Sequence, residues 1–258
     1  MPTFTAAKVA LSPLLIWQGR QVRREAPRLP EAAGPRLGLV GLDRHSSAMP
    51  RLRLLIVGDS SGAGVGAATQ DEALAGRLSQ ALSRRLKAPI AWQLVAGTGW
   101  TTPDTVAALQ ALSDQGRLPP ADVMVTALGV NDAVHQTSPR RWQAQLDQLE
   151  HCARELTGVH QIVATAVPPM HLFPLLPQPL RWVLGRSAQA LDAALMQWTA
   201  DSGTRAYFEL PYDPAHDDVR HLMASDGFHP GPTLYQRWGE ALALQIAADY
   251  RPLMRPAT

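Results

Sequence analysis

The chain has 258 residues, of which 46% are hydrophobic and 18% are charged, a composition typical of a globular protein that can bury a large core. Its formal net charge of +2 gives no indication of nucleic-acid binding. The single cysteine, Cys152, excludes an internal disulfide.

The N-terminal part of the chain differs from the rest in charge and in pattern. Residues 1–53 carry nine Lys and Arg against three acids, a charge of +6 that leaves −4 for the remainder. The apolar stretch at 4–17 is too short for a membrane span, and it lacks the preceding charge and the cleavage site of a secretory signal. Pro, Gly and Arg are frequent in 18–52, which predicts a wrapping segment or linker. We therefore expect a cytoplasmic protein in which residues 1–52 either wrap the domain formed by 53–258 or contact a membrane surface.

From residue 53 onward, short apolar runs alternate with longer amphipathic stretches. The runs are nearly continuous in apolar residues, as expected for strands buried on both faces. These strands are predicted at 53–58, 90–96, 122–129, 161–167 and 204–210. Apolar residues at helical spacing predict helices at 71–87, 102–113, 139–156, 187–200 and 232–248. The alternation predicts a five-stranded parallel sheet with helices on both faces, a three-layer α/β/α sandwich.

Two helix starts and one irregular segment carry local signals. Thr69 and Glu72 predict a capping box at the start of the first of these helices, and the second is predicted to begin with Thr102 as its cap and Pro103 in its first turn. The segment 168–186 holds five prolines among bulky apolar residues, which predicts a structured loop. This loop either packs on the core or forms a lid or wall for an acyl chain. In the second case we expect substrate contacts from Leu172, Phe173, Leu176 and Trp182.

Polar or glycine residues follow most of the predicted strands, at the edge of a parallel sheet where ligands bind. Ser60 follows the first strand in the sequence VGDSSGAG, and Asp226 and His229 lie in DGFHPG before the last helix. A serine hydroxyl is a weak nucleophile until a base removes its proton, and an imidazole held by a carboxylate is suited to that task. These residues predict nucleophilic catalysis by Ser60, with His229 as the base and Asp226 as its partner.

Three further features predict hydrogen-bond donors for an oxyanion. The turn after Ser60 aims backbone N–H groups at developing negative charge. Asn131, in the sequence GVND after the third strand, offers a side-chain amide. The sequence AGTGWTT after the second strand offers a glycine N–H from either Gly97 or Gly99, and we favour Gly99. Each such donor is worth about 3 kcal/mol of the barrier.

These motifs, in this order and each at a strand end, resemble those of the SGNH (GDSL-type) hydrolase superfamily of esterases and lipases over residues 53–248. The resemblance implies a flavodoxin-like sandwich that needs neither a metal ion nor an organic cofactor. It implies a catalytic triad of Ser60, Asp226 and His229, and an oxyanion hole of Ser60, Gly99 and Asn131. We expect a carboxylic ester hydrolase that acts through an acyl-enzyme on small-molecule or lipid esters, with lipid-like or aryl character, and that has no nucleic-acid partner.

The sequence departs from the family pattern at two positions, and these departures affect the assignment to a subfamily rather than the predicted chemistry. Ser61 stands where the family usually has Leu, and an Asn often found early in the second motif is replaced around Ala96. Two other functions stay open on the same fold: a non-catalytic lipid- or glycan-binding module, and a carbohydrate O-acetyl esterase.

Three other interpretations of short motifs fit less well. The sequence GDSSG also fits the nucleophile elbow of α/β-hydrolases, but it follows the first clear strand, and the candidate acid and base share one loop. The glycines at 58–66 lack the following Lys-Ser/Thr of a phosphate loop. The sequence HDDVRH at 216–221 predicts a solvated loop rather than a metal site, because no second cluster completes a coordination sphere.

Overall fold

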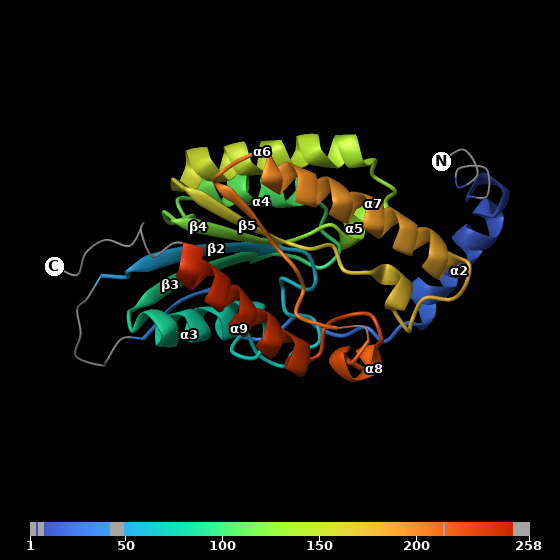
Figure 1. Ribbon diagram of the computed structural model, residues 1–258, viewed down its shortest axis with the longest axis horizontal. Helices are drawn as coiled ribbons and strands as arrows, with labels where there is room; N and C mark the ends of the chain where they lie inside the picture. Colours follow the sequence, from blue (N-terminus) through green and yellow to red (C-terminus); the bar gives the residue numbers. More distant parts are fainter. Residues whose placement is uncertain (1–3, 5–7, 42–48, 214, 250–258) are drawn as a thin grey trace.

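One sheet forms the middle layer of the computed structural model, which describes residues 4, 8–41, 49–213 and 215–249 (Figure 1). Within those residues the strands follow the order β1-β3-β2-β4-β5-β6, and β1 is antiparallel to β3 whereas the other pairs are parallel. The strands are β1 (Leu37–Val40), β2 (Leu52–Gly58), β3 (Ile90–Ala96), β4 (Val123–Ala127), β5 (Gln161–Thr165) and β6 (Arg205–Phe208). The five parallel strands correspond to the five predicted runs, which confirms the fold class.

The edge strand β1 corrects the predicted count of five strands, because the described residues form a sheet of six. It lies in the segment expected to be a wrapping segment or linker, and it extends the sheet by pairing with β3. A strand of four residues that includes Gly38 is too short to show a clear alternating pattern in sequence. The glycine is required there, because a Cβ on Gly38 would lie 2.8 Å from the indole Nε1 of Trp92.

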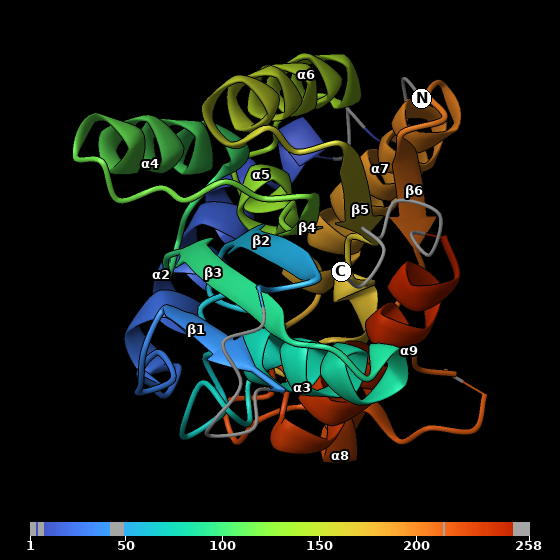
Figure 2. The same cartoon turned by 90° about the vertical axis from the view of Figure 1, so that its left-hand side faces the viewer.

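Helices cover both faces of the sheet, as Figure 2 shows. One face is covered by α3 (Leu74–Leu86) and α9 (Pro232–Asp249), and the other by α4 (Thr102–Asp114), α6 (Pro139–Thr157) and α7 (Leu180–Ala200). Short elements complete the described order: α5 (Val130–Val134), the 3-10 turn η1 (Met170–Leu172) and α8 (Val219–Leu222).

The two halves of the core explain why the central strands are continuously apolar. In β2, Leu54 and Ile56 pack in the cluster under α3 and α9, whereas Leu55 and Val57 pack in the cluster under α4, α6 and α7. Both sets are almost fully buried, and each such side chain contributes about 1.5–3 kcal/mol of transfer free energy. A central strand of this sandwich therefore has no polar face.

Two predicted helix starts and one predicted cap differ from the structure. The helix α3 begins at Leu74 after Ala73, without a capping bond from Thr69, because residues 67–73 form turns and the N–H of Gly76 bonds to the carbonyl of Gln70. The cap of α4 is Thr101, with Asp104 completing a capping box. The third, α7, starts seven residues before the predicted position and includes the end of the 168–186 segment.

The N-terminal helix α2 (Ser12–Glu25) packs against the start of α7. Gln18 is buried, accepts a hydrogen bond from the N–H of Leu180 at 3.1 Å and donates one to the carbonyl of Gln178 at 2.6 Å. This side chain thus accepts a hydrogen bond from an N–H group in the first turn of α7 that has no partner within the helix, although the two residues are 162 positions apart in sequence. Among the helices of the described residues, none combines the length and the hydropathy that a bilayer span requires.

Candidate active site

Three predicted side chains meet at the carboxyl end of the sheet. The Nε2 atom of His229 lies 2.9 Å from Oγ of Ser60, and its Nδ1 atom lies 2.5 Å from Oδ2 of Asp226. The structure therefore brings a hydroxyl, an imidazole and a carboxylate into one hydrogen-bonded chain, although Ser60 and His229 are 169 residues apart. In this order, the imidazole can accept the serine proton while the carboxylate holds the opposite ring nitrogen.

A tight turn after β2 positions Ser60, and glycines make it tight. The N–H of Val65 bonds to the carbonyl of Ser60, which closes the turn. A Cβ on Gly58 would lie 2.9 Å from both the carbonyl oxygen of Ala127 and the Cα of Gly62, and a Cβ on Gly62 would lie 2.8 Å from the Cα of Gly58. These contacts are closer than side chains tolerate, so both glycines are needed for the turn to fold back over the strand end.

The carboxylate of Asp226 is held in its ionised form by three hydrogen bonds. Burial would raise its pKa, but the ring N–H of His229 and the backbone N–H groups of His229 and Phe228 donate to it and bring its pKa below the ordinary value. The backbone bonds are both 3.0 Å long and end on Oδ1. An ionised Asp226 can therefore compensate the charge of an imidazolium formed at His229.

Two of the candidate oxyanion residues, Asn131 at the start of α5 and Gly99 on the loop after β3, are connected through Trp100. The side-chain amide of Asn131 donates to the carbonyl of Trp100 at 3.0 Å, so it contacts the loop that carries Gly97 and Gly99. Gly99 has a φ of +84°, a conformation that favours glycine, and a Cβ there would meet nothing within 4 Å. By contrast, the N–H of Gly97 donates to the carbonyl of Gly58 at 3.3 Å.

Two buried carboxyl groups, Asp132 of α5 and Asp59 beside Ser60, accept hydrogen bonds from residues around the site. Asp132 accepts bonds from the N–H and the hydroxyl of Thr102, and that hydroxyl accepts a bond from the indole of Trp142. Asp59 accepts bonds from the N–H and the hydroxyl of Ser61 at 2.9 and 2.8 Å. Burial raises the pKa of both carboxyls, to about 6 for Asp59. No motif in the sequence marks the contact between Trp142 of α6 and Thr102 of α4, so this support for the site could not be predicted.

An apolar cavity of about 60 Å³ opens beside Ser60 and His229. Its walls come from the ends of β4 and β5, from the segment after β5 and from the loops around α8 and α9. The apolar lining residues include Leu128, Val130, Phe173, Leu210, Met223, Phe228 and Trp238. The rings of Phe173 and Phe228 meet edge to face at 5.0 Å, and Phe228 contacts the His229 ring in the same way. The cavity is therefore continuous with Ser60 and His229.

Of the four side chains predicted to contact an acyl chain, Phe173 lines this cavity. Leu172 belongs to η1 and Leu176 is buried in the core beneath α7, and neither is among the lining residues. Trp182 is 41% exposed and packs against the Phe4 ring, on the outside of the molecule. Trp182 lies in the first turns of α7, which direct its side chain outward, so Phe173 is the one of these four residues that lines the cavity.

The segment 216–221, predicted to be a solvated loop rather than a metal site, is largely exposed and includes the start of α8. His216 and His221 each pair with one aspartate, Asp213 and Asp218 respectively. In the described part of the chain, no group of three or more His, Cys, Asp or Glu side chains is arranged to hold a metal ion.

Comparison with known proteins identifies the family. The sequence pattern of the GDSL-like lipase/acylhydrolase family matches residues 56–237. Among solved structures, that of TesA is 22% identical, with a TM-score of 0.57 over 78% of this chain and 99% of that one. A psychrotrophic esterase, EstA from Pseudoalteromonas sp., is 18% identical, with a TM-score of 0.56 over 76% and 97%. A family 3 carbohydrate esterase of Clostridium thermocellum is 14% identical, with a TM-score of 0.58 over 79% and 99%.

At these identities the structural matches show a shared fold, and no curated protein matches the chain significantly in sequence. The family pattern covers more than half of the chain and includes Ser60, Asp226 and His229. It confirms the family resemblance drawn from the motifs. The chain belongs to the GDSL-like lipase/acylhydrolase family and is a carboxylic ester hydrolase.

Proposed function

We propose that this enzyme hydrolyses esters with an apolar acyl group, through an acyl-enzyme formed on Ser60. The observation that carries the proposal is the 2.9 Å contact between Ser60 Oγ and His229 Nε2 beside an apolar cavity. Ser60 Oγ attacks the ester carbonyl carbon while His229 takes its proton, and the imidazolium then protonates the leaving alcohol. A water molecule repeats these steps and releases the acid, with Asp226 as the partner of His229 throughout.

The same proposal assigns three donors to the oxyanion: the N–H groups of Ser60 and Gly99 and the amide of Asn131. The bond from the Gly97 N–H to Gly58 supports Gly99 over Gly97, since a donor already used within the loop is less available to substrate. The bond from Asn131 to Trp100 uses one of its two amide protons, and the second remains for an oxyanion.

The cavity supports an apolar acyl group of moderate length. Its volume of about 60 Å³ is enough for roughly four to six water molecules. An acetyl group would leave most of this apolar surface without a partner, whereas a butanoyl or hexanoyl group would fill it. Carbohydrate O-acetyl esterase activity is the second candidate function. The observation that favours it is the fold shared with the Clostridium thermocellum carbohydrate esterase.

A p-nitrophenyl ester series from acetate to dodecanoate tests the assignment, with wild type and Ser60→Ala measured side by side. We expect wild type to show its highest kcat/KM at intermediate chain length. Ser60→Ala should show no hydrolysis above background with any ester of the series. A sharp preference for acetate would favour the carbohydrate esterase. A fluorophosphonate probe separates both from a non-catalytic binding module: the probe should add its mass to wild type and leave Ser60→Ala unmodified.

A further inference from the structure

We propose that the outward face of α2 docks the enzyme on an anionic lipid surface. We call this surface the docking face; it consists of the exposed α2 residues Pro13, Ile16, Trp17, Arg20, Arg23 and Arg24, together with the exposed Val9, which precedes the helix. The inference does not depend on which ester the enzyme cleaves.

The apolar part of the docking face is unusually exposed. Val9, Ile16 and Trp17 are 68%, 56% and 60% exposed. Together with Leu14, they make up four of the ten large hydrophobic side chains that are exposed among the described residues, all within nine positions of one segment. Apolar side chains that are gathered in this way, rather than scattered singly, mark an interaction surface.

The helix cannot bury this face by rotating, because its other side is already fixed. Gln18 is hydrogen-bonded to Gln178 and Leu180, and Leu15 and Val22 pack against the core cluster beneath α7. Residues 13, 16, 17, 20 and 24 are spaced by three and four positions, so they share the opposite side. Figure 1 shows α2 lying along the outside of the molecule beside α7.

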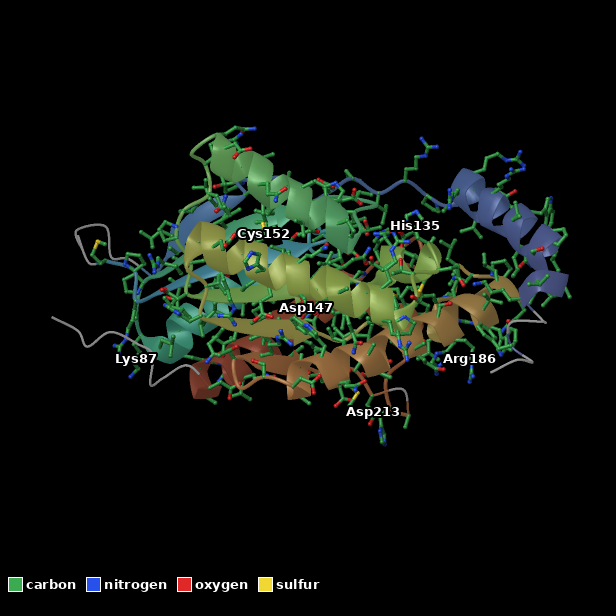
Figure 3. All side chains as sticks on the ribbon, turned by 90° about the horizontal axis from the view of Figure 1, so that it is seen from above. Lys87, His135, Asp147, Cys152, Arg186 and Asp213 are labelled. Atoms are coloured by element: carbon green, nitrogen blue, oxygen red, sulfur yellow. The ribbon has the colours of Figure 1, made fainter. Side chains whose placement is uncertain are left out.

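The charge of the docking face identifies its partner as an anionic surface. Arg20, Arg23 and Arg24 are exposed on the same side as Ile16 and Trp17. The acid within α2, Glu25, accepts hydrogen bonds from Gln21. Arg186 of α7 is exposed as well, and its guanidinium lies 5.8 Å from the centre of the Phe4 ring, at the end of the molecule where α2 lies (Figure 3). A helix with Trp and Ile beside several arginines is typical of one that lies in the headgroup region of a bilayer.

The docking face is connected to the wall of the active-site cavity. Gln18 holds residues 178–180, which follow the segment that carries Phe173. Within that segment the N–H of Leu175 donates to the carbonyl of Gly227, next to Asp226, at 3.2 Å. A bilayer in contact with α2 would therefore lie at the end of the molecule that holds the catalytic side chains.

Vesicle co-sedimentation of the full chain tests the proposal. The probes are phosphatidylcholine vesicles with and without phosphatidylglycerol, at low and high salt. We expect wild type to bind the anionic vesicles, with binding weakened by salt, and to bind the neutral vesicles at least about tenfold more weakly. A double variant, Ile16→Ser with Trp17→Ser, should partition onto anionic vesicles at least about tenfold more weakly than wild type. A triple variant, Arg20→Gln with Arg23→Gln and Arg24→Gln, should lose the salt-dependent part of this binding.

The matched control is Leu244→Ser, which removes a large side chain that is 58% exposed on the distant helix α9. This variant should bind vesicles like wild type, as should Ser60→Ala, whose inactivity separates docking from catalysis. All docking-face variants should hydrolyse a soluble p-nitrophenyl ester at the wild-type rate. Equal binding to neutral and anionic vesicles, or unchanged binding by the Ile16/Trp17 double variant, would overturn the proposal. The proposal would also be overturned if wild type bound no vesicles and formed a dimer that dissociated in the double variant. The docking face would then be covered by a second copy of this chain.

Discussion

Glu31 Oε1 accepts hydrogen bonds from both the N–H and the hydroxyl of Thr98, at 2.7 and 2.8 Å. Thr98 directly precedes Gly99, so a residue of the N-terminal segment holds the loop that carries the proposed oxyanion donor. Arg36 strengthens the arrangement, because it forms an ion pair with Glu31 and donates to the carbonyl of Ala96. The family pattern begins at residue 56, and this support for the loop therefore comes from outside it.

Replacing Glu31 should impair catalysis more than binding. In Glu31→Ala the loop loses two hydrogen bonds, so the N–H of Gly99 is less well aimed at the oxyanion. We expect kcat to fall about tenfold to a hundredfold with KM little changed, because the donor acts in the transition state. Steady-state kinetics on a p-nitrophenyl ester measures both constants.

The matched control for Glu31 is Glu25→Ala, which removes an N-terminal glutamate that bonds only with Gln21 among the hydrogen bonds of the described residues. It should keep wild-type kinetics. If Glu31→Ala lowered the melting temperature and left kcat intact, Glu31 would be a structural residue with no positioning role.

Ser60 and His229 should act as one unit. Ser60→Ala and His229→Ala should each lower kcat by several orders of magnitude, on the order of 10⁴-fold or more, and the double variant should be hardly worse than either. The reason is that each replacement already removes the proton transfer along the 2.9 Å contact. Additive losses in the double variant would mean that the two residues act in separate steps.

Asn131→Ala should lower kcat by about 10² to 10³-fold, the usual loss for one oxyanion donor. The amide of Asn131 is held beside the loop that carries Gly99 by its hydrogen bond to Trp100. Removing the amide leaves a gap at this position and creates no steric clash. Circular dichroism checks that the variant is folded. Full activity in a folded Asn131→Ala would assign the third donor to another group.

Enlarging the cavity should shift the acyl-chain preference. Phe173 lines the cavity and contacts Phe228 next to the base, so Phe173→Ala creates space where the acyl chain would end. We expect the best p-nitrophenyl ester to become longer by a few carbons, at a stability cost of about 3–5 kcal/mol. Phe173→Leu should shift it less. Trp182→Ala is the control, because Trp182 is exposed on α7, and it should leave the chain-length profile unchanged.

The meeting of Ser60, Asp226 and His229 and the central strands could be predicted because their signals are local. Strands buried on both faces are apolar throughout, and Ser60, Asn131 and His229 stand in motifs directly at the ends of elements. Ser60 and His229 meet because the parallel strands end at one edge and α9 starts there, so topology rather than sequence distance determines the contact.

The features that could not be predicted depend on contacts between distant segments. The start of α7 depends on a bond from Leu180 to Gln18, and no pattern near Leu180 indicates it. The strand β1 is stabilised by pairing with β3, not by its own four residues. Composition identifies the apolar segment that holds Leu172, Phe173, Leu176 and Trp182, but only the fold determines that Phe173 is the one of them that faces the cavity.

The buried carboxyl of Asp59 should make stability depend on pH in an unusual direction. Burial raises its pKa from an ordinary value of 3.8 to about 6, which outweighs the bonds from Ser61 that lower it. Between these two pH values the folded protein binds more protons at this site than the unfolded chain, so stability falls as pH rises from about 4 to about 6. A shift of about two units corresponds to a loss of about 3 kcal/mol, which persists at higher pH.

Asp59→Asn isolates this effect, because the amide oxygen can still accept the bonds from Ser61 and does not titrate. Urea unfolding of both proteins from pH 4 to pH 8 measures the difference in the free energy of unfolding. Relative to wild type, the variant should gain up to about 3 kcal/mol between pH 4 and pH 6 and keep that gain at pH 8. Asp226, whose pKa is lowered, acts in the opposite direction, but it is present in both proteins and cancels in the difference. A difference that stays constant across this range would show that Asp59 titrates normally, and that its environment is more polar than its burial indicates.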